Sequence, residues 1–68
     1  MSGLITKVDG SDPSNVYVGE AAAAVTGVSP FWRIQKVVVS GASVSVLWAD
    51  GNEEFDNVWD DRASLVYS

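Results

Sequence analysis

The stretch FWRIQKVVVSGASVSVLWA, from Phe31 to Ala49, decides the fold. It contains two runs of β-favouring residues joined by Ser40-Gly41, a joint short enough for a tight hairpin. In the second run, apolar side chains alternate with small polar ones from Ser43, which is typical of a half-buried strand. In the first run the apolar face switches near Lys36-Val37, which indicates either a bulge or a strand buried on both faces.

Two further strands are predicted before this hairpin. Leu4–Val8 is short and apolar, and it ends at the turn pair Asp9-Gly10. After a loop rich in turn residues, Asn15–Glu20 again favours β structure. The alanine-rich segment Ala21–Pro30 is too short to hold a helix alone, so we predict a loop of small, closely packed residues.

The C-terminal part predicts a turn, a helical turn and a final strand. Asp50-Gly51-Asn52 predicts a sharp turn, and Glu53–Phe55 a short return strand. Within Phe55–Arg62 three apolar residues follow helical spacing, which predicts one helical turn that points them inward. Ala63–Tyr67 predicts a last strand. We therefore expect an all-β single domain over residues 1–68, a five-stranded barrel or curled antiparallel meander with one short helical turn.

The composition limits the chemistry that the chain can perform. It has 68 residues, no cysteine and no histidine. Disulfides, thiolate zinc sites and imidazole bases are therefore excluded. A domain of this size buries only about 60% of its unfolded surface. Because 47% of the residues are apolar and three are tryptophan, we expect stabilisation by assembly, no enzymatic activity and no cofactor.

The charge balance disfavours nucleic acids and anionic membranes as partners. The formal net charge is -5, and the four cations Lys7, Arg33, Lys36 and Arg62 are scattered along the sequence. No apolar run reaches the ~18 residues that span a bilayer. The first seven residues do not resemble a secretory leader, so we expect synthesis in a cytoplasm.

The acidic segment Asp50–Asp61 allows two interpretations. Oxygen-bearing side chains occur at every second position from Asp50 to Asp56, and such ligands suit calcium. The EF-hand spacing is not met, and a plain turn with a solvated acidic rim accounts for the same residues. Our prediction has no metal site, but calcium binding by this segment stays open. Arg33 and Arg62 are expected to bridge these carboxylates, either within a copy or between copies.

Most of the seven aromatic side chains are expected to form the core. Phe31 and Trp32 follow Pro30 and are the best candidates for exposure. Together with Tyr17 and Tyr67, they are the predicted partner-binding residues. Exposed aromatic rings also suit a carbohydrate-binding module, which is a further alternative.

Several short motifs resemble small proteins encoded among the virion genes of tailed bacteriophages. They include WRIQK (32–36), WADGN (48–52) and FDNVWDDRASL (55–65), and the distinctive part is the DGN…FD…WD run within the last two. ITKV (5–8) and VYVGEA (16–21) extend the resemblance over most of the chain. The resemblance implies a small β module, present in many copies as a capsid decoration or cement protein or as part of the tail or a fibre.

This resemblance implies localisation in the virion after synthesis in the bacterial host cytoplasm. The implied partners are other virion proteins (capsid or tail) or copies of the chain itself, bound through exposed strand edges and aromatic side chains. It implies no catalytic residues. The alternative is a small acidic phage-encoded regulator or inhibitor that blocks a basic site on a partner protein.

Overall fold

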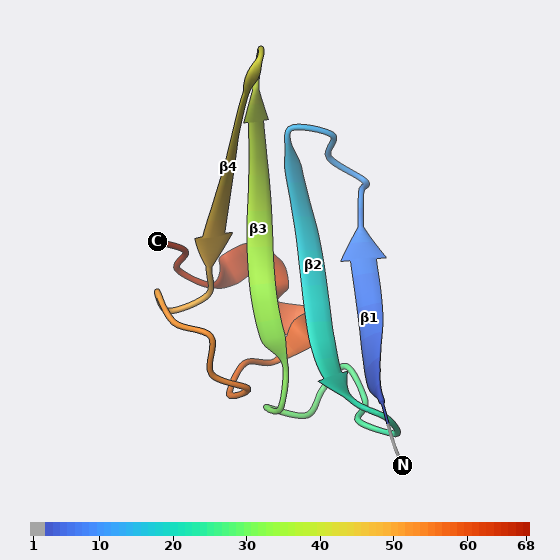
Figure 1. Cartoon of the computed structure of the whole chain (residues 1–68). Helices are drawn as coiled ribbons and strands as arrows, with labels where there is room; N and C mark the ends of the chain where they lie inside the picture. The colour runs from blue at the N-terminus through green and yellow to red at the C-terminus, as the bar shows by residue number, and fades with distance from the viewer. Residues whose placement is uncertain (1–2) are drawn as a thin grey trace.

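The fold is a four-stranded antiparallel meander with one face covered by the C-terminal segment (Figure 1). The computed structural model describes residues 3–68. In this part of the chain the strands are β1 (Leu4–Asp9), β2 (Asn15–Ala22), β3 (Arg33–Ser40) and β4 (Ser43–Trp48), in the order β1-β2-β3-β4. A short 3-10 helix, η1 (Trp59–Ser64), follows. The expected all-β class is confirmed.

The central hairpin forms as the sequence predicts. Ser40 pairs with Ser43, so Gly41 and Ala42 are the two turn residues. Gly41 has φ +60° at the first of these positions, which fits a type II′ turn. The ladders of β3 with β2 and with β4 keep one register from end to end, so no bulge forms at Lys36-Val37. The switch in the pattern arises because β3 has apolar side chains on both faces.

A second tight turn redirects the chain after β4. Asp50 and Gly51 have φ values of 60° and 72°, and the amide of Asn52 donates to the carbonyl of Ala49 at 3.4 Å. Two successive positive φ values are the signature of a type I′ turn, for which Asp-Gly is a preferred pair. The chain then turns behind the lower half of the sheet as seen in Figure 1.

Two predictions for the C-terminal part are wrong. Residues 53–55 form no return strand. Ala63 and Ser64 belong to η1, and Tyr67 forms only an isolated bridge with Ala49 in place of a fifth strand. The sheet therefore stays open and forms no barrel. A helical turn forms but begins at Trp59, where the amide of Asp60 donates to the carbonyl of Gly27 at 3.0 Å. Of the three apolar residues expected to point inward from it, Trp59 is buried, whereas Phe55 precedes η1 and is 40% exposed.

The hydrophobic core lies between the sheet and this C-terminal segment. Its fully or almost fully buried members within the described residues are Ala21, Trp32, Ile34, Ala49 and Trp59. The rings of Trp32 and Trp59 lie 5.6 Å apart between centroids, and small side chains leave room for them against the sheet. Ala21 was expected in a loop, but β2 continues to Ala22, which places Ala21 in this core.

Gly19 allows the ring of Trp59 to lie directly on β2. A Cβ atom at position 19 would lie 2.6 Å from Cζ3 of Trp59 and 3.1 Å from Cε3 of Trp32. Both distances are shorter than an ordinary van der Waals contact, and neither indole can move far within a packed core. The absence of a side chain at Gly19 therefore sets how closely the C-terminal segment approaches the sheet.

We predict that Gly19→Ala lowers the free energy of unfolding by about 1–3 kcal/mol, because the added methyl group overpacks the contact with Trp59. Urea denaturation followed by tryptophan fluorescence measures the change. Gly10→Ala is the matched control, since a Cβ there meets nothing within 4 Å. Equal stability of the two variants would contradict the proposed packing.

Candidate protein-binding surface

The structure buries one of the predicted contact residues completely. Trp32 is 0% exposed, and its indole N–H donates to the carbonyl of Thr26 at 2.9 Å. Its backbone forms two hydrogen bonds with Asn57, which hold the C-terminal segment against it. The expected exposure of Trp32 is therefore wrong, and this side chain lies in the core. Phe31, its neighbour, is 58% exposed as expected and stays a candidate contact residue.

Tyr17 and Tyr67 come together on the covered face of the sheet. Their ring centroids are 5.8 Å apart, and both side chains are half-buried against the core. The hydroxyl of Tyr67 donates to the carbonyl of Arg62 at 2.8 Å. Burial, with the nearby Tyr17, raises the pKa of Tyr67 to about 12. These contacts attach the C-terminal end to the sheet, and a role in binding a partner stays a prediction for both residues.

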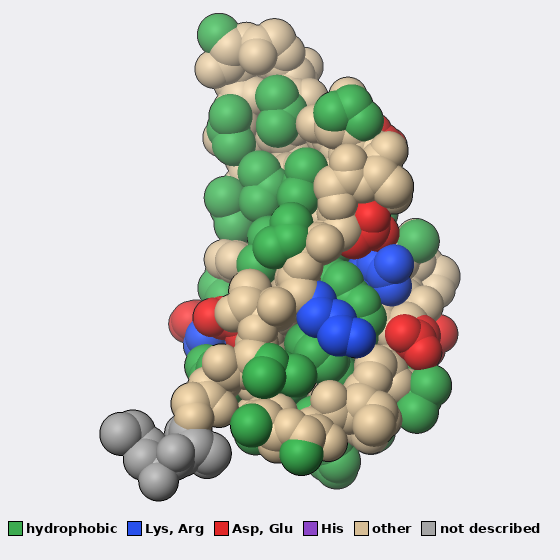
Figure 2. Space-filling view, turned by 90° about the vertical axis from the view of Figure 1, so that its right-hand side faces the viewer, with side chains coloured by type: hydrophobic (Ala, Val, Ile, Leu, Met, Phe, Trp, Pro, Cys, Tyr) green, Lys and Arg blue, Asp and Glu red, His purple; other side chains and the backbone are tan. Residues whose placement is uncertain are grey.

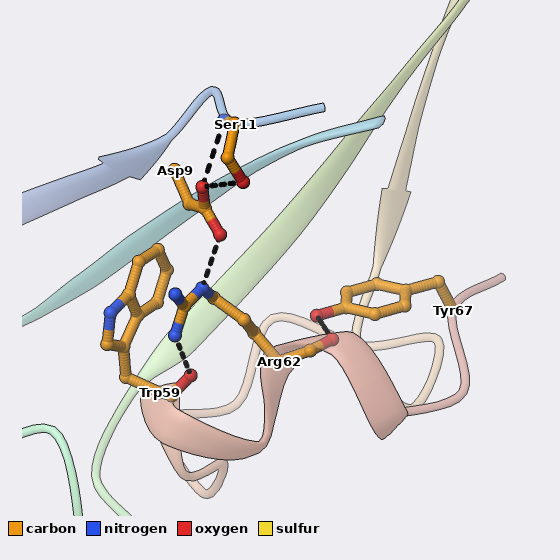
Figure 3. A network of polar contacts seen from close by, with 5 residues as sticks. All are labelled: Asp9, Ser11, Trp59, Arg62 and Tyr67. Carbon is orange, nitrogen blue, oxygen red and sulfur yellow. Dashed lines mark hydrogen bonds and ion pairs between the residues drawn. The ribbon is translucent and has the colours of Figure 1, made fainter. Parts of the chain in front are cut away.

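Arg62 connects η1 to the end of β1 (Figure 3). Its Nε donates to Oδ2 of Asp9 at 2.9 Å, and its NH1 donates to the carbonyl of Trp59 at 3.1 Å. The guanidinium also lies over the ring of Trp59, 4.6 Å from the centroid. The sequence predicted that Arg62 would pair with the acidic segment, within a copy or between copies. Within the described chain this is wrong, because the fold places Asp9 beside it, and pairing between copies stays a prediction.

Asp9 accepts hydrogen bonds from both the hydroxyl and the amide of Ser11, at 2.7 and 3.0 Å. These bonds, followed by that from Arg62, lower the pKa of Asp9 from 3.8 to about 2. Hydrogen bonds of this kind favour the ionised carboxylate. The turn after β1 and η1 are thus joined through one ionised side chain.

The opposite face of the sheet carries valines from all four strands and is largely open to solvent, with Phe55 lying against Arg33 at the end where β3 begins. In the antiparallel ladders Val8 lies opposite Val18, Val16 and Val46 flank Val37, and Val39 lies opposite Val44. Directly opposed residues share a face. We call this surface the valine face; it consists of Val8, Val16, Val18, Val37, Val39, Val44, Val46 and Trp48, with the uncharged Gln35 between Val18 and Trp48.

The exposed fractions of its side chains and the space-filling view both show that the valine face is open to solvent. Val8, Val44 and Val46 are 64%, 62% and 51% exposed. Figure 2 shows hydrophobic side chains gathered in a band along the sheet, on the side away from the C-terminal segment. Sequence reasoning did not identify this surface, although the signal was present as alternate valines in three strands.

The valine face carries no charge. Within β1–β4, the charged residues that share this side of the sheet are Glu20 and Arg33, which lie opposite each other. Nε and NH2 of Arg33 donate to Oε1 of Glu20 at 3.2 and 2.6 Å. Arg33 was also predicted to pair with the acidic segment. Within a copy this is wrong, because its neighbour across the ladder is Glu20. The paired charges leave the surface neutral.

Comparison of the chain with protein-family models, with curated proteins and with solved structures finds no match. Among residues 3–68 no pocket is present, and no group of three or more acidic side chains is arranged to hold a metal ion. In the same residues, no helix has the length and hydrophobicity that crossing a membrane requires.

We predict that stability falls as the pH decreases from about 4 to about 2. The pKa of Asp9 is lowered in the folded state, so its stabilising effect is complete above the unfolded value of 3.8 and is lost as the pH approaches 2. Asp12, whose pKa is also lowered, contributes with the same sign. Thermal unfolding at a series of pH values measures this dependence.

Asp9→Asn should be less stable than the wild type at neutral pH and should show a shallower response to acid. Asp61→Asn removes an exposed carboxylate from η1 and serves as the control, with an unchanged acid response. An acid response in Asp9→Asn as steep as in the wild type would refute the role of Asp9.

Proposed function

We propose that the protein is a structural protein of the bacteriophage virion and acts by multivalent protein–protein contacts. It is a capsid decoration or cement protein, or a module of the tail or a fibre. The observation that favours a binding role most strongly is the valine face, a continuous apolar surface on a small acidic protein. Exposed apolar patches of this kind are typical of protein interaction sites.

Three features of the chain support this proposal. Its motifs resemble those of small phage virion proteins, and the two most buried tryptophans, Trp32 and Trp59, lie within them. Without histidine or cysteine, it lacks the side chains that most often act as general base or nucleophile. Its core is small, so binding to a neighbouring subunit adds burial that the isolated chain cannot supply.

On the particle the valine face packs against a neighbouring protein, and Phe31 extends the contact at the end of the sheet. The acidic segment stays in water or faces a basic surface. In this proposal the chain is made in the cytoplasm of the bacterial host and then joins the virion, and it binds neither nucleic acid nor membrane. Catalysis plays no part in its action.

The second candidate is an acidic regulator that blocks a basic site on a partner. The distribution of charge favours it. Residues 50–62 contain six carboxylates and one guanidinium, which accounts for the whole formal net charge of -5. Such a surface attracts a basic partner at long range. A regulator of this kind acts in the infected cell and is absent from the finished particle.

Purified particles of the phage that encodes the chain distinguish the two candidates. We predict that quantitative mass spectrometry finds many copies of the chain per particle. Val46→Asp, introduced into that phage, should lower the copy number several-fold because it places a charge on the valine face. Val66→Asp, at an exposed valine outside this face, is the control. Absence of the chain from wild-type particles would contradict the structural role.

A further inference from the structure

We infer that the valine face binds the valine face of a second copy of this chain, so that two sheets form a β-sandwich dimer with both C-terminal segments outside. The inference deepens the proposed function, on which it rests for taking the valine face as a contact surface. It names a second copy as the partner. Three properties of the molecule support this choice: its charge distribution, the shape of the face and the size of the core.

The charge distribution favours close approach of two copies through this face. Residues 1–49 contain three carboxylates and three cationic side chains, so the entire net charge of -5 belongs to the acidic segment 50–62. Within that segment η1 lies behind the sheet, and residues 50–56 run beside β3 beyond the end of β4 (Figure 1). Packing two valine faces together places η1 outside the interface and residues 50–56 at its rim, where water and salt screen the repulsion of their carboxylates.

The one charged pair on this side of the sheet does not oppose association. Oε1 of Glu20 lies 2.6 Å from NH2 of Arg33, and the guanidinium lies over the rings of Phe55 and Trp48 at 4.7 and 5.6 Å. Both charges therefore have partners within their own copy. A second copy therefore does not need to supply a counter-ion. A charged partner protein would bring one, but burying its charge would cost desolvation free energy.

The shape of the face suits an identical surface. Its valines form rows across neighbouring strands, as in the row Val16, Val37 and Val46. Side chains of the same size in regular rows can interdigitate with the same rows on a second sheet, at the ~10 Å separation of sheets in a sandwich. A twofold axis produces this arrangement without any further surface feature.

The area is sufficient for a reversible dimer. The strands contain six, eight, eight and six residues. At ~4.8 Å between strands and ~3.3 Å per residue, one face covers roughly 400–500 Å² in projection. Two faces together bury roughly 800–1,000 Å², and somewhat more once the relief of the side chains is included; this is the range of weak, transient interfaces, below the ~1,200 Å² of stable ones. We therefore expect a dimer that dissociates on dilution.

The sheet also lacks a covering layer on the side of the valine face. The C-terminal segment supplies one covering layer, and the described residues provide none for the valine face. The β3–β4 hairpin extends above the C-terminal segment, so its upper part is bare on both sides (Figure 1). A second copy gives each sheet a partner layer, as in a two-sheet sandwich.

Sedimentation velocity on the purified chain, over about a hundredfold range of concentration, tests the inference. We expect a monomer–dimer equilibrium in the wild type. The double variant Val37→Thr/Val46→Thr should raise the dimer dissociation constant at least about tenfold, because it places hydroxyl groups in the interface while keeping β-branched side chains. The matched control is Val28→Thr/Val66→Thr, at valines that are 71% and 74% exposed and lie outside the face. It should behave as the wild type.

A measurement on the wild type alone keeps the test valid if the double variant does not fold. Trp48 is on the valine face, whereas Trp32 and Trp59 are already buried in the monomer. Dimerisation should therefore decrease the quenching of tryptophan fluorescence by acrylamide as the protein concentration rises. Quenching that is independent of concentration would contradict the inference.

Two sedimentation results would overturn the inference. One is a folded wild type that stays monomeric at every concentration. The other is an oligomer that the valine-face variant leaves unchanged, which would indicate association through the strand edges. If either result accompanies many copies in purified particles, another virion protein covers the valine face and the proposed function stands. If the chain dimerises but is absent from particles, the proposed function fails and the dimer stands.

Discussion

The contact of Trp59 with Gly19 is the constraint on which the rest of the structure depends. The indole lies against the bare backbone of β2 and beside Trp32, and it forms the centre of a core with few buried side chains. Removal of a buried tryptophan ring typically costs about 3–5 kcal/mol, a large part of the stability of a small domain. Arg62 supports this position, because it stacks on the same ring and bonds to Asp9.

This contact also decides which face of the sheet is covered. With Trp59 seated on Gly19, η1 lies on one side of the sheet, and the opposite side keeps most of its valines in water. The molecule is therefore polarised, with its net charge in one segment and an uncharged apolar surface across the sheet. The proposed binding role and the proposed dimer both follow from this polarity. The uncharged apolar face favours contact with another protein, whereas the acidic segments of two copies repel each other.

The local features of the sequence predicted much of the fold. Alternation and turn pairs identified all four strands to within two residues at each end, and the Gly41 turn. Features that depend on distant partners were not predictable in this way. Trp32 is buried because residues 57–59 return to it, and Arg62 bonds to a carboxylate 53 positions earlier. The last strand was lost for the same reason, because η1 extends to Ser64.

The candidate surface was visible in the sequence only as separate valines. Each alternates correctly within its strand, but which of the two faces stays open depends on where the C-terminal segment packs. That in turn depends on a glycine in β2, whose role no local pattern reveals. Phe31 was correctly expected to be exposed. It lies next to Trp32, whose side chain turns inward.

The proton NMR spectrum of Gly19 tests the central claim most directly. If the indole of Trp59 lies on this residue, its ring current should shift an α-proton of Gly19 strongly upfield, and nuclear Overhauser effects should connect that proton to the rings of Trp59 and Trp32. An α-proton of Gly19 at an ordinary chemical shift, without an Overhauser effect to either ring, would contradict the account.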